Sequence, residues 1–212
     1  MTRSSPSAAL AGALIEDQAV LPRLRELAPS RPITWSEAHS VAERQATLLL
    51  EMLFITEPPV PQFAISSLPG IVVDRRPGWP TSGMAVRARS HWRIVLRADE
   101  TRQRQRFSLA HEFKHVLDDP VIDRMHAHLA AEQRDRRAER LCNHFAACLL
   151  MPRPWVKRDW CSGIQNIRAL ARRYYVSTHA MSTRLSELGL VPLTSAFESS
   201  QRHSSITQGG AR

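Results

Sequence analysis

The segment at 107–119 reads FSLAHEFKHVLDD and carries His111 and His115 four residues apart, with Glu112 directly after the first histidine. Side chains four residues apart share one face of an α-helix, so the two imidazoles project side by side. Neutral imidazole is a common zinc ligand, and a carboxylate beside the ion can take a proton from water. The spacing predicts a metal centre with Glu112 as general base, and a surface helix with two solvated histidines is the alternative.

The other side of this helix is apolar. It carries Leu109, Phe113, Val116 and Leu117. The helix therefore has one face for a hydrophobic core and a second face for the imidazoles.

A catalytic zinc site needs a third protein ligand besides the two histidines. The pattern HExxHxxGxxH is excluded, because Asp118 and Val121 occupy the positions of its glycine and third histidine. A later helix then has to supply the donor. The residues after His115 with a suitable atom are Asp118, Asp119, Asp123, His126, His128, Glu132, Asp135 and Glu139.

Glu139 differs from the other candidates because of the segment that follows it, AERLCNHFAACLLMP. On a helix over 127–150, Glu139 and Asn143 lie one turn apart on one stripe. A carboxylate one turn before an amide suits a metal ligand and a group that hydrogen-bonds the other ring nitrogen of a ligating histidine. A solvated surface acid among arginines is the alternative for Glu139.

The predicted fold is α+β and mainly helical, with a small three-stranded antiparallel sheet. Strands are predicted at 70–74, 83–88 and 91–97, joined by turn residues into a meander. In the third strand, Trp92, Ile94 and Leu96 alternate with Arg93, Val95 and Arg97, as in a sheet with one covered face. Helices are predicted after the N-cap Thr34, with Glu37 completing a capping box, and at 101–118, 127–150, 164–174 and 178–188.

The chain of 212 residues fits one domain with loose ends. Residues 1–32 are predicted to be an N-terminal appendage, partly helical or disordered. The main domain is expected over 33–193, including a helix pair at 164–189 that looks like a helix-turn-helix. Residues 194–212 lack apolar periodicity and are predicted to be a disordered tail.

Charge and cysteine content limit the partners and the compartment. A net charge of +9 attracts polyanions, but the arginines are spread along the chain, so DNA is only a weak candidate partner. Three cysteines without a CxxC pair argue against a disulfide framework and favour the reducing cytoplasm. No apolar stretch approaches the ~20 residues of a membrane span, so no membrane association is expected.

Taken together, these residues resemble the ImmA/IrrE family of zinc-dependent metallopeptidases. The resemblance rests on RQRFSLAHEFKHVLDD, on ERLCNHFAACLLMP, and on the tail LARRYYVSTHAMSTRLSELGL, in this order. It implies a zincin-like peptidase domain in which His111, His115 and Glu139 bind zinc, with manganese as the alternative metal. Glu112 is then the catalytic acid and base. Cys142 stands where the family usually has alanine. The small thiol is expected to pack like alanine, and the alternative is a soft donor that affects metal identity and redox sensitivity.

The resemblance also implies a function. The expected activity is that of an intracellular zinc endopeptidase that cuts a helix-turn-helix repressor, derepressing genes of a mobile element or a stress response. An extended substrate is expected to pair with the sheet edge at 92–97. The alternative is a non-hydrolytic metal-binding regulator or toxin-like partner that acts by binding protein or DNA.

Overall fold

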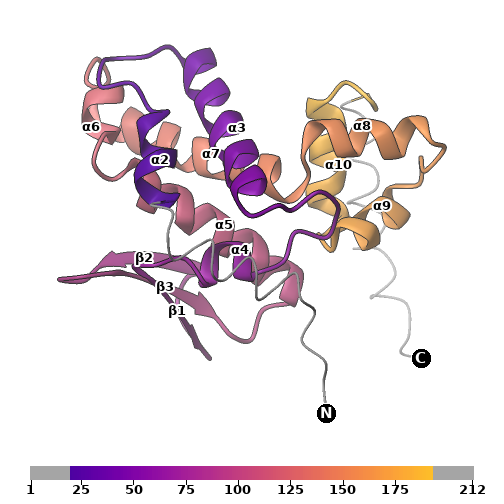
Figure 1. The fold of residues 1–212 in the computed structure, drawn as a ribbon, viewed down its shortest axis with the longest axis horizontal. Helices are drawn as coiled ribbons and strands as arrows, with labels where there is room; N and C mark the ends of the chain where they lie inside the picture. The colour runs from indigo at the N-terminus through magenta and orange to yellow at the C-terminus, as the bar shows by residue number, and fades with distance from the viewer. Residues whose placement is uncertain (1–19, 193–212) are drawn as a thin grey trace, which may run out of the picture.

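The computed structural model of this protein describes residues 20–192. The N-terminal part of the predicted appendage and the predicted tail at 194–212 lie outside this range. The elements are α2 (Val20–Glu26), α3 (Trp35–Met52), α4 (Phe63–Ser66), β1 (Ile71–Arg76), β2 (Gly83–Arg87), β3 (Trp92–Arg97), α5 (Arg102–Asp118), α6 (Ile122–Met125), α7 (Ala131–Leu150), α8 (Arg153–Cys161), α9 (Ile167–Tyr174) and α10 (Thr178–Glu187) (Figure 1). The prediction of a mainly helical fold with a small three-stranded sheet is confirmed.

Helix α5 lies at the centre of the molecule. It packs against β2 and β3 on one side and against α7 on another, while α3 packs against α7 (Figure 1). The predicted apolar face of α5 is confirmed, because Phe113 and Leu117 are fully buried. The ring of Phe113 meets the ring of Phe145 from α7 at a centroid distance of 6.2 Å. This contact fixes α5 and α7 side by side, so their polar faces meet at the same edge.

The sheet is mixed, with strand order β1-β3-β2. β2 pairs with β3 antiparallel, as predicted, but β1 pairs with β3 in parallel, so the prediction of an antiparallel meander is wrong for β1. The segment at 77–82 joins β1 to β2 without pairing them, and β3 lies between these two strands. This strand is the most apolar of the three, and its Val95 is buried together with Ile94 and Leu96, contrary to the predicted alternation. A central strand has no free edge, so substrate pairing at 92–97 is excluded.

The start of α3 follows the predicted capping box. The Thr34 hydroxyl accepts from the backbone N–H of Glu37 at 3.2 Å, and the Glu37 carboxylate accepts from the backbone N–H of Thr34 at 2.8 Å. Two N–H groups that no helical carbonyl can reach are thereby satisfied.

Helix α2 packs in the same core as the elements after residue 33. Its Leu24 is fully buried, and the Leu24 carbonyl accepts a 2.9 Å hydrogen bond from the side-chain amide of Gln45. The Arg25 guanidinium donates to the Val116 carbonyl at 2.8 Å, near the end of α5. Part of the segment predicted as an appendage therefore supports the central helix.

The C-terminal helices α8, α9 and α10 gather beside the rest of the molecule (Figure 1). The predicted pair is present: Ser177 caps α10 by accepting from the Ala180 N–H at 3.1 Å, and Gly189 follows the helix with φ +68. Helix α8 was not predicted. Pro152 and Pro154 lie at its N-cap and in its first turn, where a missing N–H costs no helical hydrogen bond. Within 20–192, no helix has the length and apolar character needed to cross a bilayer.

Candidate metal centre

The structure brings His111, His115 and Glu139 together from two helices. The Nε2 atoms of the two histidines lie 3.2 Å apart on α5. From α7, Glu139 places Oε2 3.3 Å from His111 Nε2 and Oε1 3.2 Å from His115 Nε2. A nitrogen and oxygen donor set of this kind fits zinc, which binds imidazole at about 2.0–2.1 Å and carboxylate oxygen at about 2.0–2.2 Å.

Asn143 lies against the outer nitrogen of His111. The Nδ1 of His111 is 3.0 Å from the Oδ1 of Asn143, so a proton on Nδ1 is donated to the amide oxygen. This tautomer leaves the lone pair of Nε2 directed at the neighbouring donors. Burial, followed by the charge of His115, also lowers the pKa of His111, which favours the neutral ring that a metal needs.

Glu112 lies between α5 and the strand β2. Burial raises its pKa to about 7, although a hydrogen bond from the backbone of Ala85 opposes this shift. On the same strand, Gly83 is in close contact with the Glu112 side chain, and a methyl group at position 83 would stand 2.8 Å from Glu112 Cγ. The contribution of β2 was not predicted, because nothing in the sequence indicates which strand lies over the helix.

Two cavities meet at these residues. The larger, of about 560 Å³, is lined by Thr81, Gly83, Met84, Ala85, Trp92, His111, Glu112, His115, Asp118, Asp119, Ile122, Ala138, Glu139 and Cys142. The second, of about 310 Å³, shares His111, Glu112 and Glu139 with the first, and Arg104 and Asn143 also line it. The candidate metal ligands and the candidate base therefore line the same pair of adjoining cavities.

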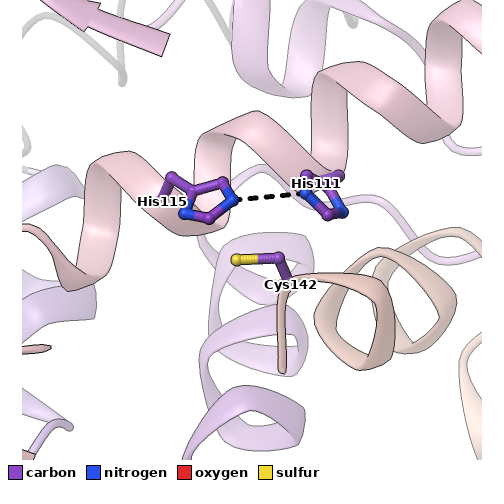
Figure 2. A group of neighbouring side chains, drawn as sticks. All are labelled: His111, His115 and Cys142. Carbon is purple, nitrogen blue, oxygen red and sulfur yellow. Dashed lines mark hydrogen bonds between the residues drawn. The ribbon is translucent and has the colours of Figure 1, made fainter. Parts of the chain in front are cut away.

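Cys142 is the other potential donor near the histidines. Its sulfur and one ring nitrogen from each of His111 and His115 lie within 4.8 Å of one another. Figure 2 shows the cysteine reaching from the neighbouring helix toward the two imidazole rings. Burial raises the pKa of the Cys142 thiol well above its ordinary value, so the sulfur stays protonated unless a cation replaces the proton.

Several of the remaining acids considered as third ligands are engaged elsewhere. Within 20–192, these pairs are Asp118 with Lys114 at 2.6 Å, Asp119 with Arg87 at 3.4 Å, Asp123 with Arg134 at 2.8 Å and Glu132 with Arg136 at 2.9 Å. His126 is buried, and its ring lies edge-on to that of His128 at a centroid distance of 6.5 Å. Among the predicted candidates, Glu139 is therefore the one that the fold places between the imidazoles.

Two metalloproteases are similar in sequence to this chain. The chain is 32% identical over 127 residues to the radiation response metalloprotease IrrE of Deinococcus deserti, covering 57% of this chain and 45% of that protein. It is 30% identical over 137 residues to the protein of the same name from Deinococcus radiodurans, covering 61% and 40%. The chain thus spans less than half the length of these two relatives.

A solved structure and a family profile complete the comparison. A Mycobacterium tuberculosis transcriptional regulator shares the fold with a TM-score of 0.54 at 19% identity, over 80% of this chain and 52% of that one. The profile of the IrrE N-terminal-like domain matches residues 67–186. This range includes His111, His115, Glu112 and Glu139. Since this match covers more than half of the sequence, the chain belongs to the IrrE N-terminal-like domain family of metalloproteases.

Proposed function

We propose that this protein is a metal-dependent endopeptidase that uses zinc, with manganese as the alternative metal. One observation carries the proposal: His111, His115 and Glu139 lie within 3.3 Å of one another, and Glu112 lines the same cavities. A zinc ion at these residues would supply Lewis acidity to a peptide carbonyl. Three protein donors also match the ligand number of catalytic zinc sites.

Glu112 is the residue proposed to move protons. Its pKa of about 7 lets the carboxylate accept a proton from the attacking water and return it to the leaving amine near neutral pH. The backbone N–H of Ala85 donates to this carboxylate, so β2 helps to orient the group. Arg104 lines the smaller cavity together with Glu112, so its guanidinium would add a positive charge near a carbonyl oxygen bound there.

An extended peptide is proposed to lie along β2. This strand pairs with β3 on one side, and in the described sheet it has no partner on the other. Its residues Gly83, Met84 and Ala85 line the larger cavity. Main-chain hydrogen bonds to this edge would hold a substrate across the histidines without fixing its sequence.

The proposed substrate is a helix-turn-helix transcriptional repressor, cut in the cytoplasm. Two kinds of support exist: the motifs resemble those of peptidases that cut such repressors, and the two relatives are named radiation response metalloproteases. Cleavage would release the genes that the repressor controls, in a mobile element or a stress response. DNA remains a weaker candidate partner, through the helix pair α9 and α10.

The test is a cleavage assay on the repressor encoded by the neighbouring gene. The purified protein is incubated with that repressor and either Zn²⁺ or Mn²⁺, and fragments are identified by mass spectrometry. Cleavage is expected with the wild type, and its loss is expected in Glu112→Gln and Glu139→Gln. Glu132→Gln is the matched control, because this acid lies on the same helix as Glu139 and is paired with Arg136.

The same assay separates the enzyme from the binding alternative. Glu112→Gln should retain bound metal, measured by elemental analysis, while it loses cleavage. If repressor inactivation persists in Glu112→Gln and no fragments form, the protein acts by binding and the peptidase proposal is wrong.

A further inference from the structure

Cys142 lies three residues after Glu139 on α7. Cys142 as a whole is 1% exposed, whereas the side chain of Glu139 is 61% exposed. One donor therefore reaches the histidines from the solvent side and the other from inside the protein. In Figure 2 the sulfur of Cys142 lies beside the pair of imidazole rings.

The separations between the donor atoms can be compared with those of a tetrahedral ion. Metal distances of about 2.0–2.1 Å to nitrogen and about 2.3 Å to sulfur put neighbouring donors roughly 3.3–3.6 Å apart. The two histidines and Glu139 are already at 3.2–3.3 Å. The sulfur of Cys142 lies within 4.8 Å of the ring nitrogens, so a shift of about 1 Å brings it to ligand distance.

We propose that Cys142 is a fourth protein ligand of this metal centre, selecting thiophilic divalent ions. This inference rests on the proposed function, in which His111, His115 and Glu139 hold the ion. On binding, the S–H bond breaks, the proton passes to solvent, and the sulfur electron pair is donated to the metal. Thiolate favours zinc, cobalt(II) and cadmium over manganese, which prefers oxygen donors.

A fourth protein ligand has a consequence for activity. A metal with four protein donors has the closed coordination of structural zinc sites, whereas catalytic sites keep one position open. Cys142 then has to leave the ion before a peptide carbonyl can approach it. The thiol would restrain the peptidase, and removal of the thiol should increase cleavage.

Cobalt(II) spectroscopy tests the ligand directly. The metal-free full-length chain is titrated with Co²⁺, and the near-ultraviolet charge-transfer absorption that a Co²⁺–thiolate bond produces is recorded. The band is expected in the wild type and in Cys148→Ala, and it is expected to disappear in Cys142→Ala and Cys142→Ser. Cys148 is the matched control, because it is also buried on α7 but its sulfur lies 3.4 Å from His144 Nε2.

Competition between metals provides a second readout. Loss of the thiolate should lower the affinity for Cd²⁺ at least 10-fold, while the affinity for Mn²⁺ changes by less than 3-fold. Circular dichroism of each variant establishes that it is folded. If Cys142→Ala does not fold, Cys142→Ser carries the comparison: the band has to be absent in this variant and present in Cys148→Ala, because all three cysteines are free thiols.

Failure of this inference differs from failure of the proposed function. If Co²⁺ binds the wild type with visible d–d bands and without the charge-transfer band, Cys142 is no ligand and the peptidase proposal stands. The same holds if the charge-transfer band persists in Cys142→Ala. If Co²⁺ does not bind at all, both the metal centre and its fourth ligand are rejected.

Discussion

Gly83 on β2 and Glu112 on α5 lie so close together that a larger residue at position 83 would displace the Glu112 side chain. A methyl group at position 83 would stand 2.8 Å from Glu112 Cγ and 2.9 Å from its Oε1. The Glu112 side chain thus occupies the space that a side chain at position 83 would need. The position of the proposed base depends on this contact.

Gly83→Ala should lower the cleavage rate by about 10- to 100-fold, because misplacement of a catalytic group by about 1 Å has an effect of this size. Stability should change little, since the Glu112 side chain can move toward the cavity. Both kcat and KM are measured for repressor cleavage, and kcat is the constant expected to fall. Val86→Ala, at an exposed position of the same strand, is the control. Equal rates for Gly83→Ala and the wild type would show that the contact does not position Glu112.

Asn143→Ala should weaken zinc binding by about 10- to 100-fold, because it removes the acceptor that holds Nδ1 of His111. Asn143→Asp keeps an oxygen acceptor at the same place and should retain most of the affinity. Competition with a chelating dye measures both affinities. An equal loss in the two variants would mean that the hydrogen bond does not orient the ring.

The buried pair of Lys114 and Asp118 should contribute strongly to stability. Lys114 is fully buried and donates to Asp118 at 2.6 Å and to the side-chain oxygen of Gln45 at 2.7 Å. Lys114→Met leaves the Asp118 carboxylate buried without its partner, so the free energy of unfolding should fall by about 3–5 kcal/mol. Urea denaturation measures this change.

Two comparisons test that interpretation of the pair. The double variant Lys114→Met with Asp118→Asn should recover a large part of the loss, since no buried charge remains. Arg136→Met, which breaks an exposed pair with Glu132, should cost less than about 1 kcal/mol. A small effect of Lys114→Met would indicate that solvent reaches Asp118.

The protein should lose stability in acid through His144. Burial, followed by the charge of His39, lowers the pKa of His144 from 6.5 to about 3. The ring stacks on His39 at a centroid distance of 4.0 Å and stays neutral in the folded state, whereas the unfolded chain takes up a proton below pH 6.5. The free energy of unfolding should therefore decrease as the pH falls from 6.5 toward 3, by about 2–4 kcal/mol from this residue.

Urea unfolding at pH 7 and pH 4 measures this contribution. His144→Gln should reduce the difference in stability between the two pH values, and His128→Gln, at an exposed position, should leave it unchanged. An unaltered difference in His144→Gln would assign the acid sensitivity to other groups.

The sequence by itself determined the local features of this protein. The spacing of His111 and His115 placed both rings on one helical face, and the apolar residues on the other side of the same helix identified the buried face. The capping box at Thr34 and Glu37 marked the start of α3. These features were predictable because they depend on the 3.6-residue period and on hydrogen bonds between residues close in the chain.

Only the tertiary structure decided how these elements meet. Asp118 is closer to the histidines in sequence, yet Lys114 holds it in the core, and Glu139 reaches the imidazoles instead because Phe113 and Phe145 pack α5 against α7. The strand order likewise depends on which strand buries the most apolar surface, not on which turn comes first. Contacts of this kind join residues far apart in the chain, and they are selected by packing of the whole core, which no local pattern encodes.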